Sequence, residues 1–406
     1  MSTVPKFGSI GVLVVALTLA ACMSSTSSPT PTRPSTTLIA VGSTSTSAFP
    51  TTTTGGPVTV SSTPTSAPVV PVKTQVVAKG QFSGLVSGGG WLYSVQFARQ
   101  GPELARATVV RLDPTSGDVV ARSAVLPGAD SPIYVDHTLW LIAGMTRGRG
   151  RPTGLVALDP MTLRRERFVP ENSSLDSLSG SARGLLWAAL GCTLVRLDPR
   201  TGRSLQVARV EGGTQCSTTM DQGDRQLYVV VGPDLLRGQP PTPTLLLQER
   251  NASNGRLIGN AIVPSPPANA GVWVSAVAGN IWAAGGDPGI NGRIYYYRAS
   301  PLRLFSSSNG VVCQAVSSCA DGGPGPSLPS TGEFPLVDIS GGVVFVASAT
   351  GVDCFNPRTA RLDAIGETGI VSGPIVVTRT GAYGVAATVQ PGLGIVRLAL
   401  PTPCRP

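Results

Sequence analysis

The chain has 406 residues, of which 13% are charged and 41% are hydrophobic, with 49 glycines and 36 prolines. This length suits one large domain plus a tail, and the many turn-forming residues favour short strands over long helices. The formal net charge is +9, but the arginines are scattered and no aromatic-interleaved basic stripe indicates nucleic-acid binding. The charge has two readings, the base composition of a high-GC genome or attraction to anionic lipid headgroups, cell-wall polymers or acidic glycans.

The chain begins with a short apolar segment that ends at a cysteine. Lys6 supplies a positive charge, Ile10–Ala20 is nearly all apolar, and Leu19-Ala20-Ala21-Cys22 follows. This run resembles a bacterial lipobox, in which the cysteine receives a diacylglyceryl group and becomes the first mature residue. We therefore predict that residues 1–21 are a lipoprotein signal peptide. Cys22 would then carry palmitate and anchor the protein to the cell membrane on its extracytoplasmic face.

Two further readings belong to the leader. The alternative is an ordinary secretory signal in which Cys22 is incidental. Residues 10–20 are too few to span a bilayer, which takes about 20 apolar residues. The rest of the sequence contains no apolar run of that length, so we expect no transmembrane helix.

Residues 22–73 are expected to form the lipidated cysteine and a disordered tether. The segment is dominated by Ser, Thr and Pro, as in Thr51–Thr54, and Arg33 is its only charge before Lys73. Such a composition cannot bury enough apolar area to offset the entropy lost on ordering. We expect an extended spacer, with O-glycosylation as a further option, and a folded domain over residues 74–406.

An internal repeat dominates the rest of the chain. A strand containing an aromatic residue is followed by a strand that ends in a turn, at intervals of about 40 to 50 residues. In the turns Asp accepts backbone hydrogen bonds, Pro presets φ and Gly takes positive φ, which predicts a hairpin between third and fourth strands. The turns lie at 111–117, 157–162, 196–202, 250–255 and 355–359, with degenerate copies at 297–300 and 397–400.

Seven aromatic strands accompany these turns, and we expect their aromatic side chains to pack between neighbouring sheets. The sequence therefore predicts an all-β, seven-bladed β-propeller, with six or eight blades as the alternatives. The aromatic strands centre on Trp91-Leu92-Tyr93, Trp140, Trp187, Tyr228, Trp282, Phe345 and Tyr383.

The recurring Arg-Leu-Asp-Pro-x-Thr-Gly strand and turn resemble those of the pyrroloquinoline-quinone-like and related surface-repeat β-propellers. The resemblance covers about residues 74–403 and implies the architecture rather than an activity. No vicinal cysteine pair or carboxylate-rich cation site accompanies the repeat, so we predict no quinone, no other cofactor and no metal.

The last repeat lacks a fourth strand. Gly394–Leu400 has the pattern of a third strand, and the sequence ends at Pro406. We expect residues 74–78 to supply the missing outer strand and so to close the ring, because that pairing removes an exposed edge.

Six cysteines remain if Cys22 is lipidated, and an even number in an exported protein favours three disulfides. Six cysteines allow 15 pairings. The pairings that we prefer join Cys313 to Cys319, Cys354 to Cys404, and Cys192 to Cys216. No metal-binding spacing is present.

Long connections fall between second and third strands and between two blades, and both kinds leave a blade on one face. We predict that this face carries the binding surface, because recognition concentrates on loops held by a rigid scaffold. Drifting insertions without function are the alternative. The residues that we single out there are Arg147, Arg149, Arg151, Asp287 and Asn291.

No catalytic residues can be assigned from the sequence. His137 is the only histidine, it lies in a predicted turn, and a Ser-His-Asp triad would require it. We therefore expect a non-catalytic propeller that binds a protein or glycan partner of the cell envelope. The alternative is an envelope hydrolase or lyase that uses carboxylates in the central funnel.

Overall fold

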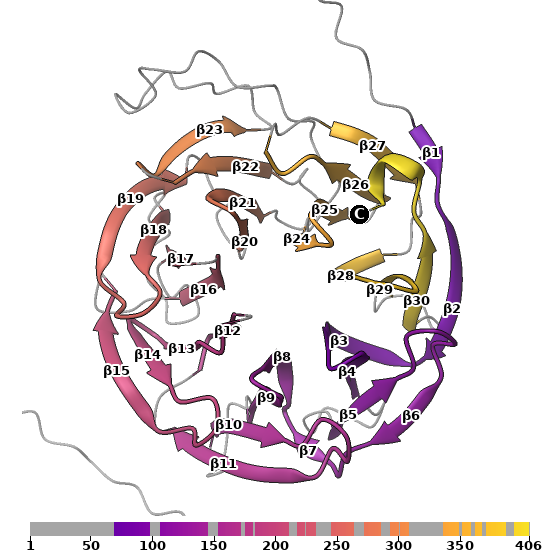
Figure 1. Ribbon diagram of the computed structural model, residues 1–406, viewed down its shortest axis with the longest axis horizontal. Helices are drawn as coiled ribbons and strands as arrows, with labels where there is room; N and C mark the ends of the chain where they lie inside the picture. The colour runs from indigo at the N-terminus through magenta and orange to yellow at the C-terminus, as the bar shows by residue number, and fades with distance from the viewer. Residues whose placement is uncertain are drawn as a thin grey trace, which may run out of the picture. The chain divides into compact units, whose positions relative to one another are not determined.

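A computed structural model describes residues 69–97, 106–144, 153–171, 175–181, 183–210, 217–223, 225–232, 245–263, 272–285, 293–299, 301–307, 336–348, 351–358, 362–367, 371–386 and 394–405. These residues form seven sheets arranged in a ring (Figure 1). The predicted seven-bladed β-propeller is confirmed. Within the described residues, no helix has the length and apolar character that a membrane crossing needs.

Each of the first three blades is a meander, and its strands follow one another in sequence order from the inside of the ring to the outside. The bounds of blade 1 are β3 (Gln81–Gly88), β4 (Trp91–Phe97), β5 (Arg106–Leu112) and β6 (Val119–Arg122), with β7 (Leu126–Pro127) added to β5. Blade 2 is β8 (Asp130–Val135), β9 (Thr138–Ala143), β10 (Thr153–Leu158) and β11 (Arg165–Glu171). Blade 3 is β12 (Ser177–Gly180), β13 (Leu186–Leu190), β14 (Thr193–Leu197) and β15 (Ser204–Arg209).

The next three blades repeat this order. Blade 4 is β16 (Ser217–Gln222), β17 (Gln226–Gly232), β18 (Leu245–Asn251) and β19 (Leu257–Val263). Blade 5 is β20 (Val272–Val277), β21 (Asn280–Gly285), β22 (Arg293–Arg298) and β23 (Arg303–Ser307). Blade 6 is β24 (Leu336–Ser340), β25 (Val343–Ser348), β26 (Gly351–Phe355) and β27 (Leu362–Glu367).

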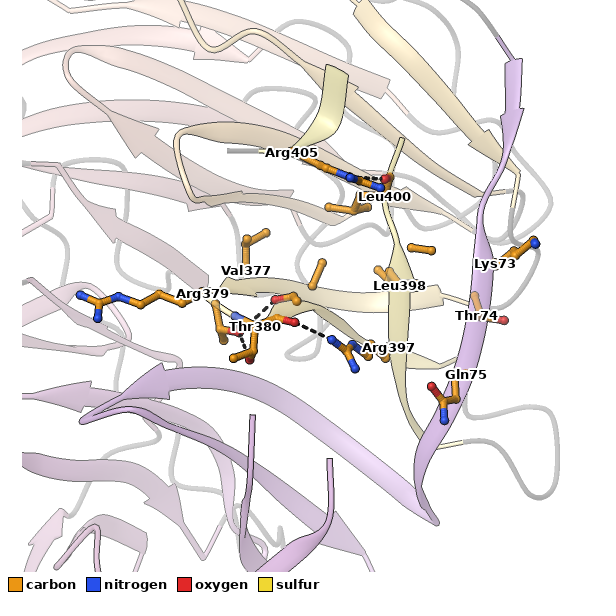
Figure 2. A pocket seen from close by; sticks show the side chains of 14 residues that line it. Lys73, Thr74, Gln75, Val377, Arg379, Thr380, Arg397, Leu398, Leu400 and Arg405 are labelled. Carbon is orange, nitrogen blue, oxygen red and sulfur yellow. Dashed lines mark hydrogen bonds between the residues drawn. The ribbon is translucent and has the colours of Figure 1, made fainter. Parts of the chain in front are cut away.

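Blade 7 joins the two ends of the described chain. It contains β28 (Val371–Thr378), β29 (Gly381–Ala386) and β30 (Gly394–Ala399), and its fourth strand is β2 (Lys73–Lys79). β2 pairs antiparallel with β30, from Lys73 opposite Ala399 to Lys79 opposite Gly394 (Figure 2). The predicted closure is therefore present, and we call this pairing the seam.

Two details at the ends of the folded domain differ from expectation. Residues 397–400 do not form a degenerate turn, because β30 ends there and the fourth strand comes from the other end of the sequence. The paired strands also begin before residue 74, since β1 (Val69–Pro71) adds in parallel to β27 of blade 6.

The hydrophobic core lies between the blades. Buried side chains of the described residues form seven clusters, one at each joint between neighbouring blades. The aromatic side chains of the second strands are fully buried in these clusters, as expected from the repeat; examples are Trp140, Trp187 and Trp282. Each blade is thus stabilised by its two neighbours rather than by a core of its own.

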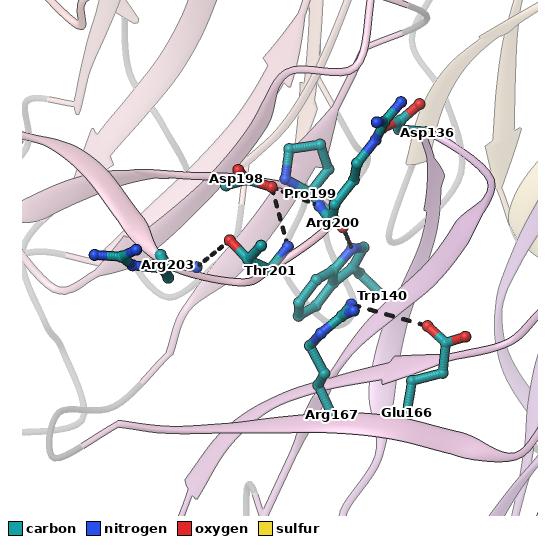
Figure 3. Close-up of polar contacts among 9 residues, drawn as sticks. All are labelled: Asp136, Trp140, Glu166, Arg167, Asp198, Pro199, Arg200, Thr201 and Arg203. Atoms are coloured by element: carbon teal, nitrogen blue, oxygen red, sulfur yellow. Dashed lines mark hydrogen bonds and ion pairs between the residues drawn. The ribbon is translucent and has the colours of Figure 1, made fainter.

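The turns between third and fourth strands fix the joints. In blade 3, Asp198 accepts the backbone N–H groups of Arg200 at 2.8 Å and Thr201 at 3.0 Å. These bonds hold the pKa of Asp198 below its ordinary value. The turn then presents the Pro199 carbonyl to Trp140 of blade 2, whose indole Nε1 donates to it at 3.0 Å (Figure 3). Trp187 of blade 3 makes the same bond to Ala252 of blade 4, at 2.9 Å.

A disulfide joins Cys354 of β26 to Cys404 in the short 3-10 helix η3 (Thr402–Cys404), with 5.7 Å between the two Cα atoms. This is one of the pairings preferred from the sequence. Cys192 is also disulfide-bonded; Cys216, Cys313 and Cys319 lie outside the described residues, as does Cys22.

Candidate binding surface

The antiparallel order of the strands brings the ends of the long connections to one face of the ring. Second strands end and third strands begin on this face, and inner strands start there. We call it the loop face and define it by these strand ends in blades 1, 2, 4 and 5: Phe97, Arg106, Ala143, Thr153, Gly232, Leu245, Gly285, Arg293 and the start of β20 at Val272.

The residues singled out from the sequence lie in the connections themselves. Arg147, Arg149 and Arg151 fall between β9 and β10, and Asp287 and Asn291 fall between β21 and β22. All five lie outside the described residues, so their role stays a prediction. The strand ends on either side of them do belong to the loop face.

Trp273 is the most conspicuous side chain on the loop face, and sequence reasoning missed it. It is the second residue of β20, the inner strand of blade 5, and 41% of its surface is exposed. The tryptophans at joints, such as Trp140 and Trp282, are fully buried. Alternation along the strand was its only sequence signal, because Trp273 precedes the aromatic strand of its blade instead of lying on it.

Cationic side chains lie at three of the described strand ends on the side of the loop face. Arg106 begins β5, Arg122 ends β6 and Arg209 ends β15, and all three are exposed. The acids described there are more sheltered: Asp130 accepts the hydroxyl hydrogen of Ser83 at 2.7 Å, and burial raises the pKa of Glu171. The described surface therefore suits an acidic or hydrogen-bonding partner better than a basic one.

Two carboxylates lie on inner strands near the centre of the ring. Asp221 of β16 accepts the N–H of Ala276 at 2.8 Å and the hydroxyl hydrogen of Ser275 at 3.3 Å, both from blade 5. Burial, together with the charge of Asp221, raises the pKa of Asp338 on β24 to about 7, although the backbone N–H groups of Ile339 and Ile375 oppose this rise. Each carboxylate thus tethers its own inner strand to that of the next blade.

The opposite face holds the single histidine. His137 is exposed, and both it and Asp136 have positive φ in the tight turn between β8 and β9. They line a cavity of about 760 Å³ with Tyr134 and Arg183, and Asp136 pairs with Arg200 at 2.8 Å. The described part of the chain contains no group of three or more His, Cys, Asp or Glu side chains placed to hold a metal ion.

Several arginines have a structural role that the sequence analysis did not find. Arg111, Arg196 and Arg397 occupy the same third-strand position, opposite the aromatic residue of the second strand. Each donates to a backbone carbonyl in the turn of the next blade: Met161, Ser253 and Thr115, respectively. These three residues therefore have a structural role at the joints, which neither of the two readings of the charge had included.

Comparison with known proteins shows the fold. No family model matches this chain, and no curated protein matches its sequence. Among solved structures, Kuenenia stuttgartiensis hydrazine synthase is similar, with a TM-score of 0.55, 10% identity and coverage of 81% of this chain and 98% of that chain. BamB from Moraxella catarrhalis aligns with a TM-score of 0.44, 12% identity and coverage of 80% and 97%, which is too weak to support an argument. At such identities the likeness establishes the β-propeller architecture that the repeat implies, and no activity.

Proposed function

We propose that this protein is a non-catalytic binding module of the cell envelope. It is held at the membrane by a lipid on Cys22, and it binds a protein or glycan partner through the loop face. The observation that carries the proposal is the exposure of Trp273 on that face. Tryptophan joins a large apolar surface to an N–H donor, and exposed tryptophans are enriched where proteins bind their partners.

The anchor supports this role in a separate way. A diacylated Cys22 would hold the protein stably, because two acyl chains bind a membrane durably where one does not. The tether that we expect within residues 22–73 would let the propeller reach outward from the bilayer. Palmitate labelling of the wild type should be lost in Cys22→Ser; labelling that persists in this variant would refute the anchor.

Partner binding is tested with Trp273. The full-length protein and its Trp273→Ala variant are compared for binding to purified envelope polysaccharide and to solubilised envelope proteins, with tryptophan fluorescence and pull-down as readouts. Val207→Ala is the matched control, because Val207 is 62% exposed on the outer strand β15, away from the loop face. We expect binding by Trp273→Ala to be at least about tenfold weaker than binding by the wild type, and binding by the control to be unchanged. Equal binding by all three proteins would refute the loop face as the binding surface.

A second candidate function is that of a hydrolase or lyase that cleaves an envelope polymer with the central carboxylates. The pKa of Asp338, which burial and the charge of Asp221 raise, favours it, because a carboxyl group that stays protonated near neutral pH can act as a general acid. Their hydrogen bonds to neighbouring strands favour the structural role. Release of reducing ends from envelope polysaccharide by the wild type, and its loss in a folded Asp338→Asn variant, would establish the enzyme and overturn the non-catalytic proposal.

A further inference from the structure

The seam is the one place among the described blades where the turn between third and fourth strands is missing. At the joints between blades 2 and 3 and between blades 3 and 4, this turn lies over the aromatic residue of the preceding blade. In blade 7, β30 leads to the C-terminal end and β2 comes from the N-terminal side. The short helix η3 covers the corresponding position over blade 6, where Cys404 is bonded to Cys354, so the end of β30 leads into η3 and not into a hairpin turn.

A cavity of about 670 Å³ lies at this end of blade 7, and we call it the closure cavity. Its walls are the first residues of β2 (Lys73–Gln75), the hairpin between β28 and β29 (Val377–Ala382), the end of β30 (397–400) and Arg405. Figure 2 shows that the labelled side chains come from both ends of the folded domain. The volume falls within the range of about 300 to 1,000 Å³ that small-molecule sites occupy.

The chemistry of the walls is one-sided. Four cationic side chains, those of Lys73, Arg379, Arg397 and Arg405, line the closure cavity, and none of its described lining residues is acidic. Thr74, Gln75, Thr378 and Thr380 add neutral polar groups. Figure 2 places Arg397 and Arg405 near the end of β30, with Lys73 and Arg379 on opposite sides.

The hydrogen bonds found at two of these cations use only part of their donors. Arg405 donates from Nε to the carbonyl of Leu400 at 3.0 Å, and Arg397 donates to the carbonyls of Thr380 at 2.5 Å and Thr115 at 3.5 Å. A guanidinium has five N–H donors, so both side chains keep capacity for a ligand. Guanidinium groups match carboxylate and phosphate geometry.

At the ordinary joints, a third-strand arginine lies near an acid from the turn of the following blade. Asp159 of blade 2 lies close enough to Arg111 of blade 1 for the guanidinium to help lower its pKa. At blade 7, Asp113 in the turn of blade 1 contributes to the raised pKa of Tyr383, the cross-strand neighbour of Arg397. No acidic side chain is among the described lining residues of the closure cavity, so a negatively charged ligand would complement its cationic walls.

We propose that the closure cavity binds a small ligand that presents an oxyanion, either phosphate or carboxylate. Cationic side chains of the closure cavity would attract the anion, and the ligand would touch residues from both ends of the folded chain. Binding would therefore hold β2 and β30 together and raise the stability of the ring in proportion to ligand occupancy.

Calorimetric titration of the full-length protein with inorganic phosphate, pyrophosphate and citrate tests the proposal, with chloride at matched ionic strength as the reference. The cavity variant is Arg379→Gln with Arg405→Gln. The control is Arg165→Gln with Arg203→Gln, which removes two exposed arginines outside the cavity. Both variants lose the same charge, so a difference between them cannot come from net charge.

We expect saturable binding of at least one anion, a rise in melting temperature with that anion, and binding about tenfold weaker or more in the cavity variant only. Tighter binding of pyrophosphate than of citrate would assign a phosphate-bearing ligand, and the reverse a carboxylate. Absence of saturation for all three anions up to about 10 mM would overturn the proposal, since that corresponds to negligible affinity. Equal loss of binding in both double variants would overturn it as well.

Discussion

Single residues decide how one blade meets the next. Two cross-strand neighbours, one on the second strand and one on the third, face the following blade at each joint. The pairs are Tyr93 with Arg111, Trp140 with Ala157, Trp187 with Arg196, Tyr228 with Glu249, Trp282 with Tyr296, Phe345 with Cys354, and Tyr383 with Arg397. Cys354 occupies the arginine position at the joint where the turn is missing. Its disulfide to Cys404 stands in place of the hydrogen bond that an arginine donates to a turn at other joints.

Trp140→Phe tests the contribution of the indole bond to stability. The substitution removes the donor to the Pro199 carbonyl and leaves a small cavity at a fully buried position. We expect the free energy of unfolding to fall by about 1 to 3 kcal/mol, measured by urea denaturation. Trp273→Phe is the control, since 41% of the Trp273 surface is exposed, and it should change stability by less than about 0.5 kcal/mol; a similar loss in both variants would contradict this account.

Asp338 predicts a pH dependence of stability. Its pKa in the folded protein is raised to about 7, above the value of about 4 that an unfolded aspartate has. The unfolded chain therefore binds fewer protons between these values, and the stability that Asp338 contributes at low pH is lost as the pH rises through about 7.

We therefore expect the stability of Asp338→Asn relative to the wild type, measured by urea denaturation, to be higher at about pH 8 than at about pH 5. Asp118→Asn, at an exposed turn position of blade 1, is the control. A difference between wild type and Asp338→Asn that stays constant across this range would contradict a raised pKa.

At the scale of elements, the turns act as spacers between blades as well as hairpin connections. The last glycine of a turn combines positive φ with close packing on the preceding blade. Gly202 has φ of +70°, and a Cβ there would lie 2.6 Å from Cγ2 of Val169 and 3.0 Å from Cη2 of Trp140. Gly255 and Gly117 repeat this arrangement against Ala208 and Val77. The conformational and steric reasons for glycine therefore coincide at these joints.

Gly202→Ala separates the two reasons when it is compared with Gly90→Ala. Gly90 also has positive φ, +83°, but a Cβ there would meet nothing within 4 Å. We expect Gly90→Ala to cost about 1 kcal/mol from backbone strain alone. Gly202→Ala should cost about 2 to 4 kcal/mol in all, because overpacking is added. Equal losses in urea denaturation would show that the neighbouring blade does not constrain this turn.

At the scale of the whole molecule, ring stability depends on one pairing that joins the two ends of the folded chain. Removing residues 73–79 takes away β2 and leaves the edge of β30 uncovered. We expect the cooperative thermal transition of the entire ring to shift strongly downward, because each blade relies on its neighbours for a core. Removal of residues 24–63 is the matched control; calorimetry that gave the wild-type transition for both deletions would exclude closure by β2.

The disulfide near the seam should add to this closure. Replacing Cys354 and Cys404 with serine removes the covalent link between two residues that are 50 positions apart in the sequence. We expect the free energy of unfolding to fall by about 2 to 4 kcal/mol. Reduction of the wild type should lower its melting temperature at least to that of the double variant, because Cys192 is also in a disulfide. A further fall on reduction would come from that second disulfide, and a double variant that melted at the wild-type temperature would contradict a stabilising role for the Cys354–Cys404 disulfide.

Much of the architecture could be predicted from the sequence because its determinants are local. The Asp-Pro turns specify their own hydrogen bonds, and aromatic strands recur at blade spacing. The number of blades and the closure of the ring by residues 74–78 could therefore be predicted. The role of Arg111 and Arg196 could not be read, because it depends on the turn of a different blade. Trp273 and the closure cavity escaped for the same reason: exposure and the missing turn are properties of the assembled ring. The binding role predicted for Arg147, Arg149, Arg151, Asp287 and Asn291 stays a prediction.

The pairing of β2 with β30 also sets the order in which the protein can be completed. Lys73 is among the first residues of the domain to be synthesised, and its partner Ala399 is among the last. Blades 1 to 6 contain all four of their strands in sequence order, so each can assemble as the chain emerges. Blade 7 can form only after the whole domain has been made, and β2 must wait with an open edge through that time. The slowest step of folding should therefore be ring closure, since it joins the most distant segments of the chain.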